Sequence, residues 1–352
     1  MRNLVGLGDV PRQWWDGLYS RCCEIIARPG DYADSCRGRI LATLFYEPST
    51  RTNFSFQAAM LRLGGNVFGF SDPMGSSVSK GETLADTIRI AAAYSDTIVI
   101  RSPHEGAATA AAIYSQVPII NAGDGSHYHP TQTLADLATI AQKRGGIGNL
   151  RIGFCGDLKY GRTVHSLVES LSLFTGVSFC FISPPELRMP EYMRALMRSR
   201  GQEYVETASL SDAIPGLDIL YMTRIQRERF SDAAEYDRLK GVYILTKDTL
   251  GCAKADMLVM HPLPRYGEIA PDVDSDPRAV YFDQARYGMF IRMALLLEFS
   301  HFPRQLPQVI DGHAGAKCAN PACVTQTEPY LPQIASVADR ASCGYCDKKF
   351  GT

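Results

Sequence analysis

The sequence predicts an α/β protein with two parallel-sheet domains, followed by a small β module that carries a cluster of cysteines. Short apolar runs rich in β-branched residues alternate with helical patterns along most of the chain. A glycine cluster interrupts this alternation near residues 143–150, and four of the ten cysteines fall within the last 35 residues. Buried β-branched runs between helices are typical of parallel sheets with both faces covered.

The apolar runs give the predicted strands, at residues 39–46, 96–101, 117–123, 151–156, 177–183, 217–223, 242–246 and 257–264. Because the glycine cluster breaks the pattern, we place a domain boundary there. The predicted parts are a first domain at 1–145 with a closing helix at 285–302, a second domain at 146–284, a linker at 303–317 and the cysteine module at 318–352.

Composition excludes several classes of function. The chain has 352 residues, 45% hydrophobic and 21% charged, which suits two globular domains. A net charge of -1 provides no general basic field for nucleic acid. Since no signal peptide or long apolar segment is recognisable, we expect a cytoplasmic protein without membrane association. Six scattered cysteines are then expected to be reduced and mostly buried: Cys22, Cys23, Cys36, Cys155, Cys180 and Cys252.

Residues 39–65 read as a strand, a turn and a helix. The strand ends near Tyr46, and Ser49 is a good N-cap for the helix that follows. Apolar residues then recur with helical spacing, and a glycine pair at 64–65 provides the stop.

The start of this predicted helix has the chemistry of a phosphate site. Its first backbone N–H groups lack intrahelical partners and carry the positive end of the helix dipole. Hydroxyls of Ser49, Thr50 and Thr52 surround that point, and Arg51 offers a planar fork for phosphate or carboxylate. An ordinary capped helix with a surface arginine remains the alternative.

The segment FYEPSTRT (45–52) also resembles the carbamoyltransferase signature, through Phe45, Glu47 and residues 49–52. Six further segments occur in the order found in aspartate carbamoyltransferase catalytic chains. They are SSVSKGETLADT (76–87), IRSPHEGAA (100–108), HPTQTLADL (129–137), GDLKYGRTVHSL (156–167), YMTRIQRER (221–229) and HPLPR (261–265).

The resemblance implies the carbamoyltransferase fold and transfer of a carbamoyl group from carbamoyl phosphate to L-aspartate, the committed step of pyrimidine biosynthesis. Such a reaction needs phosphate anchors, donors for the carbamoyl oxygen and cations for a dicarboxylate. The implied carbamoyl phosphate-binding residues are Ser49, Thr50, Arg51, Thr52, Ser77, Lys80, Arg101, His129, Gln132, Leu263 and Pro264. Of these, the implied catalytic residues are Arg51, Thr52, Lys80, Arg101 and His129, and the implied aspartate ligands are Lys80, Arg162, Arg224 and Gln226.

Several of these residues have plain structural alternatives. Arg101 ends a predicted strand, where α/β sheets present ligand groups, yet it could be a surface arginine. His129 precedes Pro130 at a helix start and could be a structural histidine. Lys80 alone would read as a solvated loop lysine. By resemblance, the loop of Ser77 and Lys80 enters the site of a neighbouring subunit, which implies a homotrimer.

The second-domain motifs favour aspartate as the acceptor. Glycines 156 and 161 are too far apart for a GxGxxG dinucleotide loop, so a nicotinamide site is rejected. Two arginines for two carboxylates suit a dicarboxylate. HPLPR lacks the cysteine typical of ornithine carbamoyltransferases, although an ornithine-type enzyme remains an alternative. Asn53 departs from the family, where many members have arginine, and we expect little catalytic effect from it.

The last cysteines form two close pairs, Cys318 with Cys323 and Cys343 with Cys346. Four thiolates in this spacing predict a tetrahedral, structural Zn²⁺ site, and a module this small needs a metal to fold. The alternatives are a disordered tail with reduced cysteines and an oxidised pair.

The module resembles the zinc domain of the aspartate carbamoyltransferase regulatory chain, normally a separate polypeptide, so the chain is read as a fusion. No nucleotide-binding part accompanies it, and weak or absent feedback by ATP and CTP is expected. Assembly beyond a trimer through the module is left open, as is a non-catalytic assembly subunit. Zinc-mediated nucleic-acid binding lacks the necessary positive charge.

Overall fold

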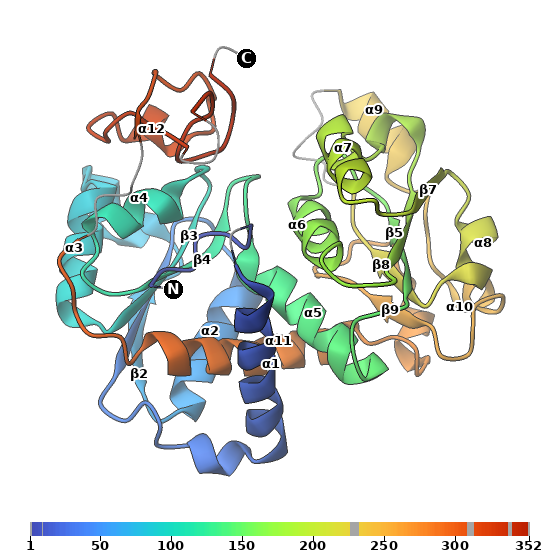
Figure 1. Ribbon diagram of the computed structural model, residues 1–352, viewed down its shortest axis with the longest axis horizontal. Helices are drawn as coiled ribbons and strands as arrows, with labels where there is room; N and C mark the ends of the chain where they lie inside the picture. Colours follow the sequence, from blue (N-terminus) through green and yellow to red (C-terminus); the bar gives the residue numbers. More distant parts are fainter. Residues whose placement is uncertain (1, 9, 226–231, 308–312, 337–339, 351–352) are drawn as a thin grey trace. The chain divides into compact units, whose positions relative to one another are not determined.

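The computed structural model describes residues 2–8, 10–225, 232–307, 313–336 and 340–350. Its contacts divide the chain into two compact units, one formed by Met1–Thr131 with Met289–Thr352 and the other by Gln132–Gly288. Each unit contains its own parallel sheet (Figure 1). Among the described residues, no helix has the length and apolar character needed to cross a membrane.

The sheet of the first unit has four parallel strands in the order β2-β1-β3-β4. These are β1 (Ile40–Phe45), β2 (Asn66–Phe70), β3 (Thr97–Ser102) and β4 (Ile119–Asp124). The chain moves from β1 outward to β2 and then returns to the other side of β1. The strand order therefore reverses between β1 and β3, which makes their carboxyl ends a topological switch point.

The helices of this unit cover both faces of its sheet. They are α1 (Arg12–Ala27), α2 (Thr50–Arg62), α3 (Leu84–Tyr94), α4 (Ala107–Tyr114), part of α11 (Tyr281–Phe299), and the short 3-10 helices η1 (Pro29–Tyr32), η2 (Pro73–Gly75) and η3 (Ser77–Lys80). Helices α3 and α4 share a buried core with β1, β3 and β4. Because α2 crosses in the opposite direction along the sheet, right-handed crossovers place it on the other face. There Arg292 of α11 lies 5.2 Å from the Phe56 ring centroid.

Helix α2 has the expected limits but a different buried face from the one its spacing suggests. It begins after Ser49 and ends before Leu63 and Gly64, whose φ of 80° suits glycine. Phe54 and Leu61 are 63% and 60% exposed. The buried side chains of α2 are Thr52, Asn53, Phe56, Ala59 and Met60. The apolar row predicted from the sequence is therefore a surface of this protomer.

The sheet of the second unit has five parallel strands in the order β7-β6-β5-β8-β9. They are β5 (Arg151–Cys155), β6 (Ser178–Ile182), β7 (Tyr204–Thr207), β8 (Ile219–Met222) and β9 (Leu258–Met260). Here the order reverses between β5 and β8, so their ends form a second switch point. The other elements are α5 (Pro130–Arg144), α6 (Arg162–Leu171), η4 (Pro185–Leu187), α7 (Glu191–Ser199), α8 (Leu210–Ala213), η5 (Ile214–Gly216), α9 (Ala233–Leu239), α10 (Lys247–Leu250), η7 (Pro271–Ser275) and part of α11.

Two parallel α/β sheets confirm the predicted fold class. Two strands of these sheets were not predicted, and one predicted strand was wrong. The edge strands β2 and β7 were missed, because both are short and incompletely buried, and Gly69 interrupts the apolar residues of β2. Residues 242–246 form no strand, since only Leu245 makes an isolated bridge, to Ile269.

A polar cluster is buried inside the second unit around Asp136. The Tyr221 hydroxyl donates to one carboxylate oxygen at 2.8 Å, and the Gln132 and Gln284 amides donate to the other at 2.8 and 2.6 Å. Burial and the Asp136 carboxylate raise the pKa of Tyr221, so its hydroxyl keeps its proton and donates. The cluster joins α5, β8 and α11 and fixes the side chain of Gln132.

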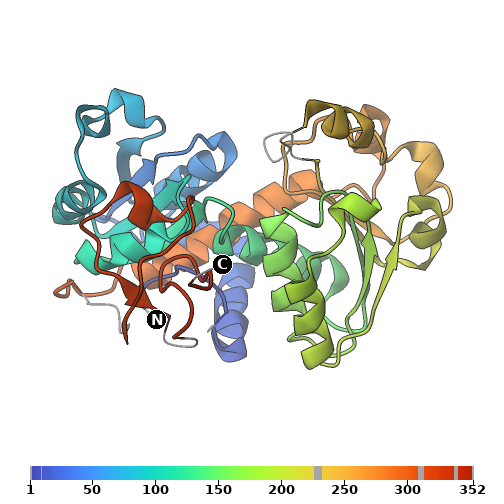
Figure 2. The same ribbon diagram turned by 90° about the horizontal axis from the view of Figure 1, so that it is seen from above.

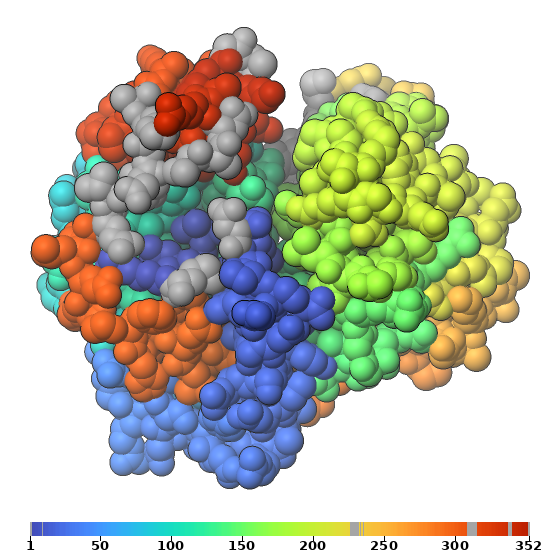
Figure 3. All heavy atoms as spheres, in the orientation of Figure 1, coloured from blue at the N-terminus to red at the C-terminus, as the bar shows by residue number. Residues whose placement is uncertain are grey.

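The C-terminal module contains the antiparallel pair β10 (His313–Ala314) and β11 (Ile334–Ala335) and the short helix α12 (Val324–Thr327). It packs directly on the first unit, against α4 and its surroundings (Figures 1 and 2). Eight buried residues of the module belong to the same core cluster as α3 and α4: Cys318, Cys323, Val324, Leu331, Ile334, Cys343, Tyr345 and Cys346. In Figure 3 its red atoms lie on the teal atoms of the first unit.

Backbone contacts join the module to the segment between β3 and α4. The Glu105 N–H donates to the Ala322 carbonyl at 2.8 Å, and the Val324 N–H donates to the Glu105 carbonyl at 2.9 Å. The Asn320 amide donates to the Glu105 carboxylate at 2.8 Å. At Gly106, where φ is 84°, a Cβ would lie 2.6 Å from the Tyr345 Cβ. Close approach of the module therefore depends on this glycine.

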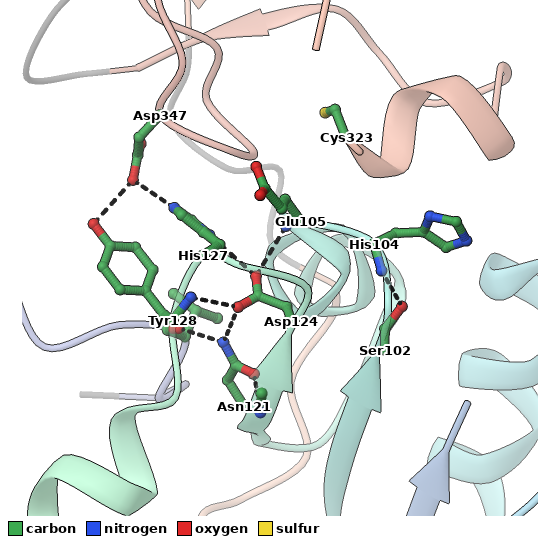
Figure 4. A network of polar contacts seen from close by, with 12 residues as sticks. Ser102, His104, Glu105, Asn121, Asp124, His127, Tyr128, Cys323 and Asp347 are labelled. Carbon is green, nitrogen blue, oxygen red and sulfur yellow. Dashed lines mark hydrogen bonds and ion pairs between the residues drawn. The ribbon is translucent and has the colours of Figure 1, made fainter. Parts of the chain in front are cut away.

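A second connection runs through His127, which lies between two carboxylates (Figure 4). Its ring nitrogens are 3.1 Å from Asp124 in the first unit's sheet and 2.9 Å from Asp347 in the module. Burial alone would lower the pKa of His127, but hydrogen bonds to the two carboxylates outweigh it and raise the pKa to about 10. His127 is thus an imidazolium at neutral pH.

Replacing Tyr221 with phenylalanine should lower the stability of the second unit. The change removes one donor from the buried Asp136 carboxylate, which typically costs about 1–3 kcal/mol. Tyr204→Phe on the edge strand β7 is a matched control, because its hydroxyl is exposed. Denaturant unfolding of the three proteins provides the measurement, and equal stability of both variants would contradict a structural role for the Asp136 cluster.

The His127 site should stabilise the protein most at low pH. An unfolded histidine titrates near pH 6.5, whereas folded His127 keeps its proton to about pH 10. Its contribution is therefore complete below about pH 6.5 and is lost as pH rises toward about 10. The difference in melting temperature between the wild type and His127→Gln should shrink over this range. A difference that stays constant with pH would argue against the charged imidazolium.

Candidate functional site

The carboxyl ends of β1 and β3 bring two arginines together in the first unit. Arg101 pairs in register with Phe45, the last residue of β1, and the chain then turns through Glu47 into α2, where Arg51 lies in the first turn. The Arg101 guanidinium is 2.9 Å from the Glu47 carboxylate and donates to the Ala122 carbonyl at 3.1 Å. Its orientation is fixed by these contacts.

The electrostatics of this point favour an anion. Burial lowers the pKa of Arg51, and the nearby positive charge of Arg101 lowers it further. Burial also lowers the pKa of Arg101, although Glu47 opposes this change. Guanidinium groups nevertheless stay charged in proteins. Two guanidiniums therefore lie near each other beside the N-terminus of a helix.

The hydroxyl residues predicted with Arg51 lie at the same helix start. Ser49 occupies the N-cap position and Thr50 begins α2. Within the described part of the chain, the Ser49 side chain makes no capping hydrogen bond to this helix. Thr52 is largely buried. The structure thus gathers Ser49, Thr50, Arg51, Thr52 and Arg101 at one switch point.

His129 and Gln132 lie at the start of α5. His129 is 6% exposed and immediately precedes Pro130, the first residue of the helix. Gln132 is held by Asp136, one turn further along. Just before His129, the Tyr128 N–H donates to the Asp124 carboxylate at 2.9 Å, which anchors the loop to the end of β4.

Ser77 and Lys80 belong to a different element from these groups, and their side chains are exposed. They occupy the short helix η3, which follows the edge strand β2. The sequence indicated an irregular loop here, whereas the structure has one 3-10 turn.

In the second unit, the predicted arginines follow the two strands that flank its switch point. Arg162 begins α6 after β5, and Arg224 comes two residues after β8. Thr223 joins the two strand ends, because it accepts from the Asp157 N–H at 3.1 Å and donates to the Cys155 carbonyl. Gln226 lies outside the described residues.

The loop of Leu263 and Pro264 is shaped by a buried pair that the sequence analysis did not single out. The Leu263 N–H donates to Nδ1 of His261 at 2.7 Å, and Nε2 of His261 donates to the Glu268 carboxylate at 2.6 Å. Burial alone would raise the pKa of Glu268, but its hydrogen bond with His261 lowers it. With φ at 54°, Leu263 adopts the left-handed conformation that few non-glycine residues take.

Three other supporting residues were given no role in the sequence analysis. Glu47 orients Arg101, Asp136 orients Gln132, and Asp124 anchors the loop before His129. Glu47 and Asp136 do fall inside quoted motifs, as FYEPSTRT and HPTQTLADL, so their positions carried a signal. Asp124 lies outside those motifs, and only the three-dimensional structure identifies it.

The four terminal cysteines converge on one point of the module. The sulfur atoms of Cys318, Cys323, Cys343 and Cys346 all lie within 4.8 Å of one another and all four residues are buried. None is in a disulfide. The cluster could hold a metal ion.

Comparison with known proteins identifies the family. The family model for the aspartate/ornithine carbamoyltransferase carbamoyl-P binding domain matches residues 2–142, and that for the Asp/Orn binding domain matches residues 148–299. The aspartate carbamoyltransferase catalytic subunit of Clostridium botulinum (strain Loch Maree / Type A3) is 55% identical over 296 residues, covering 84% of this chain and 96% of that protein. The corresponding subunit of Clostridium novyi (strain NT) is 56% identical over 295 residues, with the same coverage.

Solved structures agree with this assignment. The catalytic subunit of M. jannaschii aspartate transcarbamoylase has a TM-score of 0.80 and 47% identity, covering 85% of this chain and 98% of that chain. The Trypanosoma cruzi enzyme in complex with N-(phosphonacetyl)-L-aspartic acid has a TM-score of 0.78 and 39% identity, covering 84% and 95%. The chain therefore belongs to the aspartate/ornithine carbamoyltransferase family, among the aspartate carbamoyltransferases.

Proposed function

We propose that the chain transfers the carbamoyl group of carbamoyl phosphate to the amine of L-aspartate, using the residues gathered at its two switch points. The observation that carries this proposal is the placement of Arg51 and Arg101 at the ends of β1 and β3. In the second unit, Arg162 and Arg224 follow the corresponding strands. Each sheet thus offers cations where open α/β sheets bind ligands.

The first unit would hold carbamoyl phosphate by its phosphate. The N–H groups at the start of α2, the hydroxyls of Ser49, Thr50 and Thr52, and the Arg51 fork would anchor the phosphate oxygens. As the amine attacks the carbamoyl carbon and the carbon–oxygen bond to phosphate breaks, charge grows on the departing phosphate. The amine loses a proton as the new carbon–nitrogen bond forms, and the departing phosphate would take this proton up. Groups that bind the departing phosphate more tightly than the bound acyl phosphate lower the barrier.

The carbamoyl group itself would be polarised by donors to its oxygen. Arg101 and His129 would donate to the carbamoyl oxygen, where negative charge develops in the tetrahedral intermediate. Gln132 would accept from the carbamoyl amino group, and the Leu263 and Pro264 carbonyls would accept from the amine and this nitrogen. Glu47 and Asp136, which hold Arg101 and Gln132, support this orientation.

Aspartate would be held through its two carboxylates. Arg162 and Arg224, with Gln226, supply cations and a donor, and bidentate pairing discriminates a dicarboxylate from ornithine. We assign Ser77 and Lys80 to the site of an adjacent protomer, because both are exposed in η3. The proposed homotrimer would place α2 at an interface that buries its exposed apolar residues Phe54 and Leu61.

The cysteine cluster fits a structural Zn²⁺. Zinc–sulfur bonds of about 2.3 Å place the sulfurs of a tetrahedron about 3.8 Å apart. The Sγ atoms of Cys318 and Cys346 are 3.6 Å apart, and those of Cys323 and Cys343 are 4.0 Å apart. A zinc with four thiolate ligands is closed and contributes folding energy.

We infer that the module is a zinc domain like that of the aspartate carbamoyltransferase regulatory chain, and that it is fused here to a catalytic chain. Both family models end by residue 299, so the module lies beyond the matched region. None of the cysteines in the described chain is in a disulfide, which suits a reducing compartment such as the cytoplasm.

Arg51→Ala should lower kcat/KM for carbamoyl phosphate at least about 100-fold, because it removes a charged phosphate ligand. Arg62→Ala at the exposed last turn of the same helix is the matched control and should retain wild-type activity. Formation of carbamoyl aspartate provides the measurement, with ornithine offered in a parallel assay. Equal rates for Arg51→Ala and the wild type at limiting substrate would overturn the assigned role, and preference for ornithine would overturn the assigned acceptor.

Purified protein should contain about one zinc per chain, and removing it should unfold the module. Without a metal, four buried thiolates repel one another, and the module loses the metal-binding free energy that stabilises its fold. Metal analysis and the melting temperature before and after chelation test this, with native mass recorded in parallel. A metal-free protein with an unchanged melting temperature would refute the site.

A further inference from the structure

The C-terminal module contacts both segments that lead to the proposed carbamoyl-oxygen donors. Arg101 lies near the end of β3, and four residues later Glu105 is bonded to the module through its backbone and its carboxylate. His129 lies two residues after His127, whose ring contacts Asp347 of the module. The module thus reaches each donor within a few residues along the chain.

The two segments are also joined to each other at Asp124. One carboxylate oxygen accepts from the Gly106 N–H at 2.9 Å and contacts the His127 ring. The other accepts from the Tyr128 N–H at 2.9 Å and the Asn121 amide at 3.0 Å. Asp124 is buried, so these partners fix its position (Figure 4). A shift of one segment is therefore transmitted to the other.

Asp347 completes this arrangement from outside the catalytic domain. Its Oδ2 lies 2.9 Å from Nε2 of His127 and accepts from the Tyr128 hydroxyl at 3.1 Å. Both partners immediately precede His129 in the sequence. The rings of His127 and Tyr128 also lie against each other, with centroids 3.9 Å apart. One side chain of the module thus restrains two successive residues of the loop.

We propose that Asp347 of the C-terminal module is a positioning residue for carbamoyl transfer, acting through His127 and Tyr128 on the His129 donor. The proposal rests on the proposed function, because it assigns Asp347 to the same site. Donors to a developing oxyanion act only when they are held in place before the reaction, and a displacement of about 1 Å can cost about 100-fold in rate. The module is then part of the active-site scaffold.

The catalytic test compares Asp347→Ala with the wild type in the full-length, zinc-loaded protein. The kcat for formation of carbamoyl aspartate should fall about tenfold or more. The KM for aspartate should change little, because its proposed ligands Arg162 and Arg224 follow strands of the second unit. Asp347→Asn retains a hydrogen-bond acceptor and should lose less. In a double-mutant cycle with His127→Ala, the second change should add little to the first, since both act through one contact.

Tyr345→Phe is the matched control inside the module. It removes a hydrogen bond from the Tyr345 hydroxyl to the Pro332 carbonyl at 2.9 Å but keeps the buried ring. Zinc content and melting temperature, measured for every variant, identify any variant whose module has unfolded. Kcat of the control should equal that of the wild type.

Hydrogen exchange supplies a readout that does not depend on turnover. In Asp347→Ala, the amides of residues 127–129 should exchange faster, whereas Tyr345→Phe should leave them unchanged. If Asp347→Ala has the same kcat and the same amide exchange at residues 127–129 as the wild type, the proposal is overturned. Additive losses in the double-mutant cycle would also overturn it. If the wild type makes no carbamoyl aspartate, the proposed function fails by itself. Faster exchange would then show only the structural contact.

Discussion

The site depends on a topological constraint, the reversal of strand order within each parallel sheet. All strands of a parallel sheet end at the same edge, and where the order reverses the chain leaves toward opposite faces, which frees the ends of two adjacent strands for ligands. In the first unit this point holds Arg51 and Arg101, and in the second it is followed by Arg162 and Arg224. Local charge and topology therefore agree in both units.

Much of this could be predicted from the sequence, because buried central strands and helix starts have strong local signals. The missed strands β2 and β7 are edge strands, which lack a neighbouring strand on one side and are short and incompletely buried, so their sequence signal is weak. Residues 242–246 are apolar enough for a strand but pair only at Leu245, and pairing is a property of the fold. The spacing of apolar residues on α2 identified an apolar row. It could not show whether this row faces the core, because that depends on which side of the helix packs against the rest of the fold.

The candidate site residues also divide into those with a local sequence signal and those whose role depends on the fold. Motifs placed Arg51, Arg101 and His129, whereas the orienting roles of the nearby acids became visible only in the structure, although Glu47 and Asp136 lie inside the quoted motifs. Glu47 and Asp136 act across a turn or between elements, and Asp124 collects partners from several segments. Buried carboxylates such as those of Asp124 and Asp136 need such partners to be stable, so their surroundings identify them better than their spacing does.

Helix α4 lies where the C-terminal module packs on the first unit. Its alanines lack bulky side chains, which allows the module to approach closely and share one apolar core. The segment after α11 follows the first unit, where Arg304 donates to the Ala92 carbonyl and Gln305 to that of Gln116. Such a short tether keeps the module at an effective concentration on the order of millimolar. Dilution that would separate a two-chain complex therefore leaves this pairing intact, and the stoichiometry of the two parts is set by translation alone.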